Sequence, residues 1–441
     1  MPRISIEVTE KIIHIKNGFY THLRNLILSQ KDRIRTLSVL VLVNFVIMGF
    51  GFLTRVKIAN MLGKEGFGML AYGLALGTFG GVAVRFGMDR TLVRDLIHHR
   101  DRFGELVAGS VLLRGAIFFF VLFGILFWKA LPNYNNNLSW AIITIFIARC
   151  LLSLDLQSVY DTWQKMERHA MYNLVQRCLY FAIIWTVVII SPEKFSINLI
   201  AAALLVTAFL YLIMQHQWAW RQIIFNKTTK SVMKTALSMG SQNFIIFLAA
   251  LGGLFIGSLN QLVLKHFCGA AELGGYAAAW TITSLAMALL SQVSRIGLPA
   301  IARVTRQDTG RAERIYFLFT YSAVMFMMAA SIGIPVFFFP ELILRTIFSP
   351  EYISVAGIMR IMSIYIIIYS IAIVSSQYVV AARMERLYFF NVILGGCLSV
   401  ILCYILIPKF FGLGAVFSLL IAHGLTIALN LIGMIKHLKA C

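Results

Sequence analysis

The sequence predicts an all-α polytopic membrane protein of about twelve transmembrane helices. Three observations support this prediction: 59% of the 441 residues are hydrophobic, only 13% are charged, and long apolar runs recur along the whole chain. A soluble domain is nearer half apolar and a quarter charged, so this chain has too few charges to cover its surface in water. The composition therefore excludes a soluble globular enzyme, a disordered regulator and a disulfide-stapled secreted module.

The apolar runs fall into two sets of six. A membrane span needs about 20 mostly apolar residues to cross roughly 30 Å of hydrocarbon. On this criterion the N-terminal half contains spans at 36–62, 67–90, 104–128, 139–160, 172–191 and 196–217. The C-terminal half contains spans at 236–264, 275–299, 314–340, 354–380, 388–407 and 414–435. Several runs exceed the required length, which predicts tilted helices or helices that extend into water.

The distribution of basic residues predicts the orientation. Lys and Arg number 39 against 18 Asp and Glu, giving a formal net charge of +21. With both termini in the cytoplasm, the inner segments hold 25 of these cations and the outer connections hold six. Cytoplasmic loops of membrane proteins collect Lys and Arg, so both termini are expected inside. The basic excess then requires no nucleic-acid partner.

The chain is expected to comprise two six-helix lobes joined by a linker. Gly63 to Gly68 opens the second span of the first half, and Gly269 to Gly274 opens the second span of the other half, 206 residues later. An offset of six spans preserves orientation, so the lobes are expected to be parallel repeats related by a pseudo-twofold axis along the membrane normal. The expected divisions are a cytoplasmic N-terminal segment at 1–35, an N-terminal lobe at 36–217, a cytoplasmic linker at 218–235, and a C-terminal lobe with a short cytoplasmic tail at 236–441.

The N-terminal segment lacks the short apolar core and cleavage site of a signal peptide. Its apolar residues between Ile12 and Ile27 recur at roughly helical spacing, with basic residues among them. Such a segment either lies along the inner membrane face as an amphipathic helix or forms a frayed tail.

Eight cations fall inside the predicted spans, where each costs roughly 2.5–3.5 kcal/mol near the bilayer centre. They are Arg55, Lys57, Arg85, Arg114, Arg149, Arg177, Arg295 and Arg360. Those near span ends can extend their charged groups to the membrane surface, which accounts for Lys57, Arg177, Arg295 and Arg360. Two acids offer intramembrane pairing: Asp89 is four residues from Arg85 on one helix face, and Asp155 lies at a depth similar to that of Arg114.

Arg114 and Arg149 fall near the middle of their spans and are the predicted deep contacts for an anion. Guanidinium groups bind phosphate through two parallel hydrogen bonds and remain charged at any relevant pH. Six of the eight cations lie in the N-terminal half. A water-filled cavity that receives a diphosphate would account for this cluster. Polar residues that are candidates for sugar contacts in the seventh span are Gln242, Asn243, Asn260 and Gln261.

The turn from Ile58 to Gly68 and the later stretch Phe86-Gly87-Met88-Asp89-Arg90 with Arg94 resemble those of Wzx-type O-antigen flippases. These belong to the polysaccharide transporter branch of the multidrug/oligosaccharidyl-lipid/polysaccharide exporter superfamily. The similarity in span number and lobe organisation runs along essentially the whole chain. In the related lipid II flippases, arginines on the first, second and eighth helices line a cationic cavity, and the resemblance maps them onto Arg55, Arg85 and Arg295.

The resemblance implies a flippase that moves an undecaprenyl-diphosphate-linked oligosaccharide across the bacterial inner membrane by alternating access. The cargo would be an O-antigen unit of lipopolysaccharide, or a capsule or exopolysaccharide unit. Lipid II flippases usually carry two further C-terminal spans, so lipid II is the less expected cargo. Implied partners are membrane lipid and the polymerase and chain-length regulator of polysaccharide assembly.

Two alternatives remain. A cation-coupled multidrug antiporter of the same superfamily typically needs a carboxylate in the first or seventh span, and this chain has none there. A membrane glycan polymerase or ligase generally needs a sizeable outer loop, and every predicted outer loop is short. The six cysteines form no CxxC pair, and no zinc or phosphate-loop signature is present, so neither an enzyme nor a cofactor is expected.

Overall fold

The computed structural model describes residues 31–130, 139–222, 229–305 and 310–440, and every regular element within these ranges is helical. Ten of the described helices are long and apolar enough to cross a membrane. The fold is therefore the all-helical membrane architecture that the composition predicts. The predicted amphipathic stretch between Ile12 and Ile27 lies outside the described residues.

The helices of the two halves differ widely in length. The N-terminal half contains α2 (Lys31–Arg85), α3 (Met88–His98), α4 (Phe103–Ala130), α5 (Trp140–Leu151), α6 (Gln157–Thr162), α7 (Met166–Ile190) and α8 (Ile197–Gln222). The C-terminal half contains α9 (Thr229–Gly257), α10 (Leu259–Val304), α11 (Arg311–Phe338), α12 (Pro340–Ile347), α13 (Ala356–Ala381) and α14 (Glu385–Ala440). Much of the predicted linker 218–235 is thus helical, and the division into lobes there stays a prediction.

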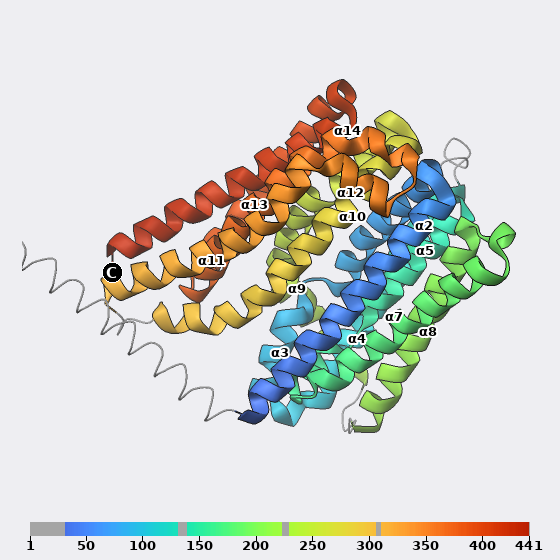
Figure 1. Ribbon diagram of the computed structural model, residues 1–441. Coiled ribbons are helices and arrows are strands. Elements are labelled where there is room, and N and C mark those ends of the chain that lie inside the picture. Colours follow the sequence, from blue (N-terminus) through green and yellow to red (C-terminus); the bar gives the residue numbers. More distant parts are fainter. Residues whose placement is uncertain (1–30, 131–138, 223–228, 306–309, 441) are drawn as a thin grey trace, which may run out of the picture.

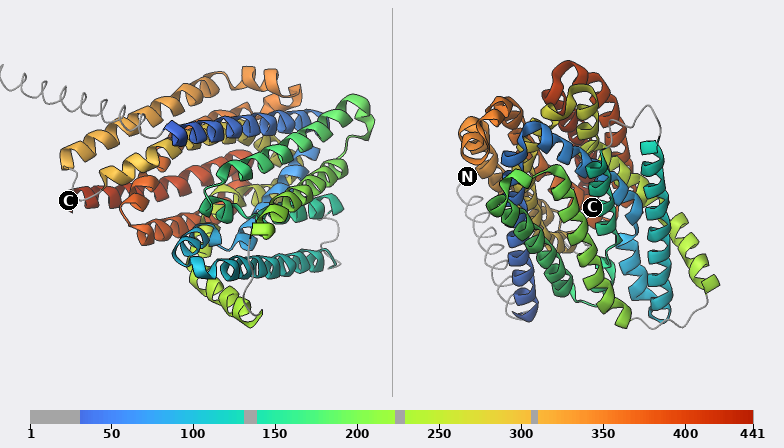
Figure 2. Two further views of the ribbon diagram at one scale, coloured as in Figure 1. Left: turned by 90° about the horizontal axis from the view of Figure 1, so that it is seen from below. Right: turned by 90° about the vertical axis from the view of Figure 1, so that its right-hand side faces the viewer.

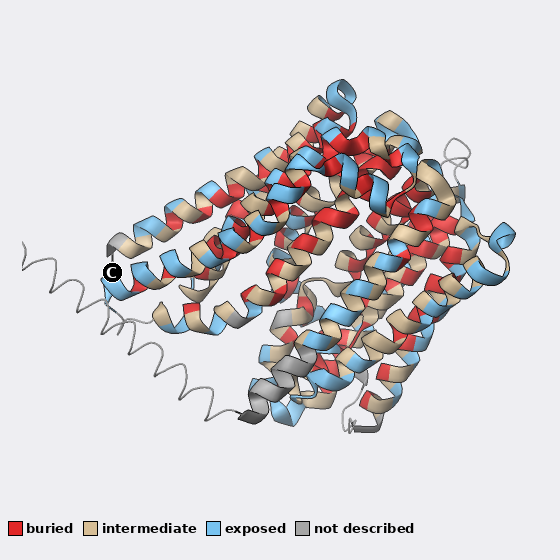
Figure 3. Cartoon of the chain, in the orientation of Figure 1, coloured by how far each residue is buried: buried red, intermediate tan, exposed pale blue. Residues whose placement is uncertain are grey.

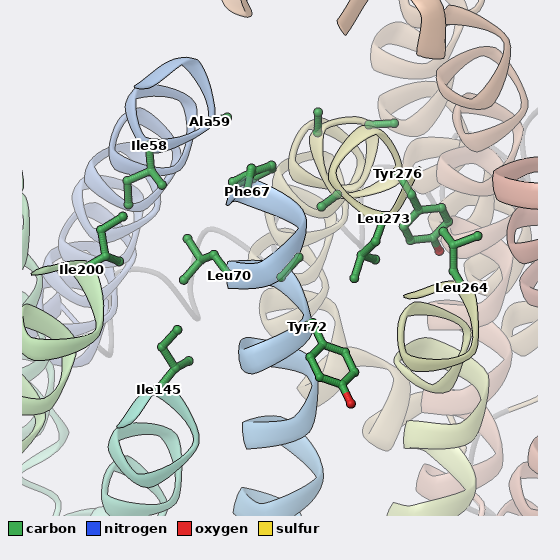
Figure 4. Packing of buried hydrophobic residues seen from close by; sticks show 14 of the residues in the cluster. Ile58, Ala59, Phe67, Leu70, Tyr72, Ile145, Ile200, Leu264, Leu273 and Tyr276 are labelled. Atoms are coloured by element: carbon green, nitrogen blue, oxygen red, sulfur yellow. The ribbon is translucent and has the colours of Figure 1, made fainter. Parts of the chain in front are cut away.

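The two longest helices each contain one non-helical residue. In α2 this residue is Gly63 (φ 67°, ψ −179°), and in α14 it is Phe411 (φ 53°, ψ −131°). In Figure 4 the part of α2 that carries Ile58 and the part that carries Phe67 are two separate rods. The helix α10 is interrupted in the same way, at Gly269 (φ 88°, ψ 179°), and the number of membrane crossings stays a prediction.

The helices of the two halves form two groups, except that the start of α9 packs on α4 of the N-terminal half, where Ser231 and Thr235 donate to Glu105. In Figure 1 they lie close together near the reversal of α2 and diverge from there like the arms of a V, with the start of α2 and the end of α14 on different arms. Figure 2 shows the same grouping from two other directions.

The arms meet where α2 and α10 cross through glycines. A Cβ atom on Gly68 would overlap the carbonyl oxygen of Ala270, and one on Gly274 would overlap the carbonyl oxygen of Lys64. The two contacts are equivalent. Gly274 lies 206 residues after Gly68, and Ala270 lies 206 residues after Lys64, which is the offset between the two repeated turns. We call this end of the molecule, formed by residues 59–68, 269–274 and 347–355, the turn end.

Polar contacts reinforce the turn end. The Asn60 side chain donates to the Ile347 carbonyl (3.0 Å) and accepts from the backbone N–H of Ser349 (2.8 Å). The Tyr352 hydroxyl donates to the Ala59 carbonyl (3.2 Å). These bonds join the first reversal of the chain to the segment between α12 and α13, so the turn end is closed by contacts between the two halves.

Buried apolar residues are most dense near the turn end. Figure 3 shows buried residues gathered where the two groups of helices meet. The cluster includes Ile58 and Phe67 from α2, and Leu264, Leu273 and Tyr276 from α10, each at most 4% exposed. The two halves therefore share one apolar core at this end of the molecule.

Gly274→Ala should destabilise the fold, because its methyl group would overlap the backbone of α2. Overpacking of this kind typically costs about 1–3 kcal/mol. Gly49→Ala on α2 is the matched control, since a Cβ atom there meets nothing within 4 Å. Thermal unfolding of the purified protein in detergent measures both variants, and the assignment fails if Gly274→Ala is as stable as the control.

Candidate functional site

Two spans that the sequence predicts as continuous helices are broken inside the membrane region. The predicted span 67–90 breaks at Phe86 (φ 46°) and Gly87 (φ 70°), between α2 and α3. The predicted span 139–160 breaks at Asp155, which is extended (φ −61°, ψ 155°) and separates a short 3₁₀ turn from α6. The predicted span 236–264 also ends early, at the C-terminus of α9.

Two arginines and two aspartates connect these breaks. Asp155 lies 3.2 Å from Arg85 Nη2, and Asp89 lies 3.0 Å from Arg114 Nη2. Arg85 also approaches Asp89, at 3.9 Å. We call these four residues the acid–arginine network. Each carboxylate thus has a guanidinium partner and each guanidinium a carboxylate.

The network and its neighbours also satisfy backbone groups that the breaks expose. Arg114 Nη1 donates to the Asp155 carbonyl (2.8 Å), and the Leu156 N–H donates to the Gln215 side chain (3.0 Å). The Ser158 hydroxyl donates to the Asp89 carbonyl (2.9 Å). In hydrocarbon each unsatisfied backbone group costs several kcal/mol, so these bonds explain how a span can unwind here.

Arg114 therefore differs from the prediction in two respects. Its carboxylate partner is Asp89, and it reaches Asp155 through the backbone carbonyl. It is only 3% exposed, and both of its Nη atoms are engaged within the protein. The physical reason is that the break at Asp155 turns the carboxylate toward Arg85 and leaves a carbonyl that needs a donor.

Three further arginines form a group without acids, which we call the arginine cluster: Arg55 on the first part of α2, Arg149 on α5 and Arg177 on α7. The charge of Arg149 lies within electrostatic range of those of Arg177 and Arg55. In the described part of the chain, none of the three forms an ion pair with a carboxylate. Arg55 is exposed, whereas Arg149 and Arg177 are half-buried.

The arginine cluster has unused hydrogen-bond donors. The Arg149 Nη2 atom donates weakly to the Thr78 hydroxyl (3.4 Å). Among the described residues, the buried Nε atoms of Arg149 and Arg177 have no hydrogen-bond partner. Like charges held together in a medium of low dielectric constant repel strongly. The cluster is therefore an arrangement that an anion or water stabilises.

The remaining intramembrane cations lie elsewhere. Arg295 on α10 is exposed and interacts electrostatically with Asp161, which faces the acid–arginine network. Lys57 lies 5.5 Å from the ring of Trp185, and Arg360 donates to the Phe337 carbonyl (3.2 Å). The structure thus places the charges of Arg55 and Arg85 within electrostatic range of Arg149, and that of Arg295 within electrostatic range of Asp161.

Arg177 is the residue that sequence reasoning missed. Its position near a predicted span end suggested that it reaches the membrane surface, but the structure places it beside Arg55. One sequence signal was available, because Tyr180 lies three residues further along α7 and is buried beside both arginines. An aromatic hydroxyl on the same helix face indicates a protein interior rather than a lipid surface.

Most of the polar residues suggested for sugar contacts are engaged in helix packing. Asn243 bonds to the Thr91 hydroxyl (2.6 Å), and Asn260 donates to the Tyr276 hydroxyl (2.6 Å). Gln242 donates to a serine on its own helix. The Asn243 contact joins α9 to α3 and is of the interhelical kind common in membrane proteins.

Comparison with solved structures shows the fold. A structure of the lipid II flippase MurJ in an inward closed conformation superposes with a TM-score of 0.72 at 14% identity, over 91% of this chain and 89% of that one. An inward-facing multidrug resistance MATE family transporter of the MOP superfamily gives 0.67 at 12% identity, over 88% and 95%. An outward-facing MATE family transporter gives 0.55 at 12% identity, over 92% and 94%.

Comparison with sequences shows the family. No curated protein matches this chain. The model of the family described as polysaccharide biosynthesis protein matches residues 34–305, which is more than half of the chain. The matched region contains the arginine cluster, the acid–arginine network and the crossing of α2 with α10. The chain is a multi-pass membrane protein with the fold of the MOP-superfamily transporters, and it belongs to the polysaccharide biosynthesis protein family.

Proposed function

We propose that the chain is a flippase that moves a polyprenyl-diphosphate-linked oligosaccharide, such as an O-antigen, capsule or exopolysaccharide unit, across the bacterial inner membrane. The observation that carries this proposal is the arginine cluster of Arg55, Arg149 and Arg177. It holds three guanidinium groups together without a carboxylate partner in the described residues. A diphosphate supplies the missing negative charge and accepts from several guanidinium N–H groups at once.

Partly exposed charges mark the route toward the cluster. The side chains of Arg85 and Asp89 are 41% and 46% exposed, and Arg295 is exposed on the opposing half. In a membrane span, exposed charges of this kind face water rather than lipid. We assign Arg85 and Arg295 to the first contact with the diphosphate and the arginine cluster to its deeper position, while Arg114 keeps the helix breaks in place.

The arrangement of the two halves supports an inward-facing state. The turn end, which the distribution of basic residues places outside, is closed by the glycine crossing and by Asn60 and Tyr352. The arms diverge toward the end expected in the cytoplasm (Figure 1), where the start of α9 keeps its contact with α4 through Glu105, Ser231 and Thr235. The higher TM-score against the inward-facing MATE family transporter than against the outward-facing one agrees with this assignment. Rocking of the halves would then release the cargo outside.

Export of organic cations is the rival function, because MATE family transporters share the fold. A cation-binding cavity is stabilised by carboxylates, whereas this chain gathers guanidinium groups. The charge of the arginine cluster repels a cationic drug and attracts a diphosphate. We therefore retain the flippase as the function that the site supports best.

Arg149→Ala and Arg177→Ala should each abolish surface polysaccharide in cells that lack the native copy, at normal protein levels. A hydrogen bond to a charged group contributes about 1.5–3 kcal/mol, so binding of undecaprenyl diphosphate to the purified protein should weaken about tenfold or more. Arg149→Lys keeps the charge but not the paired donors, and it should weaken binding less.

Arg360→Ala is the matched control, because Arg360 lies in a span and donates to a backbone carbonyl away from the arginine cluster. It should bind undecaprenyl diphosphate like the wild type. Wild-type affinity in Arg149→Ala and Arg177→Ala would argue against the proposed site. Raised resistance to cationic dyes on overexpression, with surface polysaccharide unaffected by deletion, would favour the multidrug transporter.

Arg114→Ala and Arg149→Ala should change stability in opposite directions. Loss of Arg114 removes the partner of Asp89 and leaves the buried Asp155 carbonyl without a donor, which should destabilise the protein by about 3 kcal/mol. Loss of Arg149 relieves repulsion within the arginine cluster and should leave the protein as stable or more stable, as is common at binding sites. Thermal unfolding without lipid separates the two roles, and equal loss of stability in both variants would contradict the assignment.

A further inference from the structure

The C-terminal half contains a cavity that no residue of the arginine cluster lines. Its volume is about 240 Å³, and it lies among α9, α13 and both parts of α14. Three rings form one wall: Tyr365, Tyr369 and His423. We call it the aromatic cavity. Water occupies about 30 Å³ per molecule in the liquid, so the space is that of about eight waters and suits a single ring-sized group.

The wall of the aromatic cavity is held in place by contacts among its own rings. The Tyr365 hydroxyl and His423 Nδ1 are 2.8 Å apart, and the two ring centroids are 5.4 Å apart. Tyr369 meets His423 edge-on at 6.2 Å. Trp280 stacks behind Tyr365 at 6.3 Å. The rings therefore form a preorganised apolar surface with hydroxyl and imidazole groups at its edges.

The lining gives neutral polar groups and no charge. Ser376, Thr426 and Asn430 also face the cavity, and none of its lining residues is Asp, Glu, Lys or Arg. The lining therefore offers no guanidinium group to a phosphate and no carboxylate to a metal ion. Aromatic faces with hydroxyl and amide groups match a molecule that has both C–H faces and hydroxyl groups. A sugar ring has both of these features.

The helix α9 lies between the aromatic cavity and the stretch of α2 that Arg149 contacts. Arg149 contacts Thr78, and the next residue, Phe79, packs against Phe255 of α9 with centroids 6.1 Å apart. Phe255 lies between two glycines of α9, Gly253 and Gly257, that line the cavity. Because successive residues of a helix are about 100° apart, Phe255 points away from these two glycines, and the aromatic cavity lies across α9 from this stretch of α2.

We propose that the aromatic cavity binds one sugar ring of the cargo while the arginine cluster holds its diphosphate. This inference rests on the proposed function and adds a recognition site for the neutral part of the same molecule. The N-terminal half then selects the charge common to all such cargoes, and the C-terminal half selects the glycan.

The test compares two lipids on the full-length protein by native mass spectrometry: undecaprenyl diphosphate and undecaprenyl-diphosphate-N-acetylglucosamine. The wild type should bind the glycosylated lipid about tenfold more tightly, as expected for one stacking contact and one or two hydrogen bonds. Tyr369→Ala should remove this preference by deleting a wall of the cavity. Arg149→Ala should weaken binding of both lipids and keep the ratio.

Gly253→Leu provides a second variant that fills the cavity without removing a packed side chain, because a Cβ atom there meets nothing within 4 Å. It should also abolish the preference. Gly424→Leu is the matched control: it lies next to His423 on α14 with the same open space, but does not line the cavity. It should keep the preference.

Equal affinity of the wild type for the two lipids, or a preference that survives both Tyr369→Ala and Gly253→Leu, would overturn the sugar site while leaving the flippase intact. Failure of both lipids to bind would overturn the proposed function and this inference together. Aromatic rings also attract organic cations. If both variants lose only rhodamine 6G binding and keep the lipid preference, the cavity belongs to a cation and the sugar site is refuted.

Discussion

The structure depends on one constraint, which is that charges and backbone polar groups inside a membrane must have partners. At the breaks near Gly87 and Asp155, the protein meets this constraint internally. Arg85 and Arg114 neutralise two aspartates, and Arg114 also serves the carbonyl that the break exposes. In the arginine cluster the same constraint is left unmet by the described residues. The two groups of arginines therefore differ in their acid partners, although the buried Nε atoms of Arg85 and Arg114, like those of Arg149 and Arg177, have no hydrogen-bond partner among the described residues.

The sequence predicted the fold class and most spans because hydropathy over about 20 residues reports burial in lipid directly. Hydropathy averaged over a window of this length does not reveal a single residue with an extended backbone. Asp155 breaks its span because Arg114 and Gln215, 41 residues before it and 60 residues after it in the chain, satisfy the freed backbone groups. No local pattern records these partners. The shared turns at Gly63 and Gly269 were visible as spacing, but their reciprocal contact through Gly68 and Gly274 required the arrangement in space.

The sequence predicted that arginines inside the spans would gather, but the structure groups a set of arginines that differs in part from the predicted one. Counting cations in apolar spans singled out Arg149 because an arginine in hydrocarbon is costly, and the family resemblance pointed to Arg55. Which arginines pair with acids depends on helix rotation and on relative depth, which one sequence does not encode locally. For this reason Arg114, expected at the anion, is engaged with Asp89, and Arg177, expected at the membrane surface, lies in the cluster. The aromatic cavity escaped notice because tyrosines in membrane helices are unremarkable.

The crossing at the turn end has a consequence for how such a protein diversifies. At the glycine crossing itself the two halves touch through main-chain atoms, so that contact demands small residues at two positions, while Asn60, Tyr352 and the shared apolar core complete the join. Side chains deeper in either arm can change without altering how the arms meet. One arm is thus free to accumulate basic groups and the other to acquire rings, and a symmetric framework can house an asymmetric interior suited to a molecule with one charged end and one neutral end.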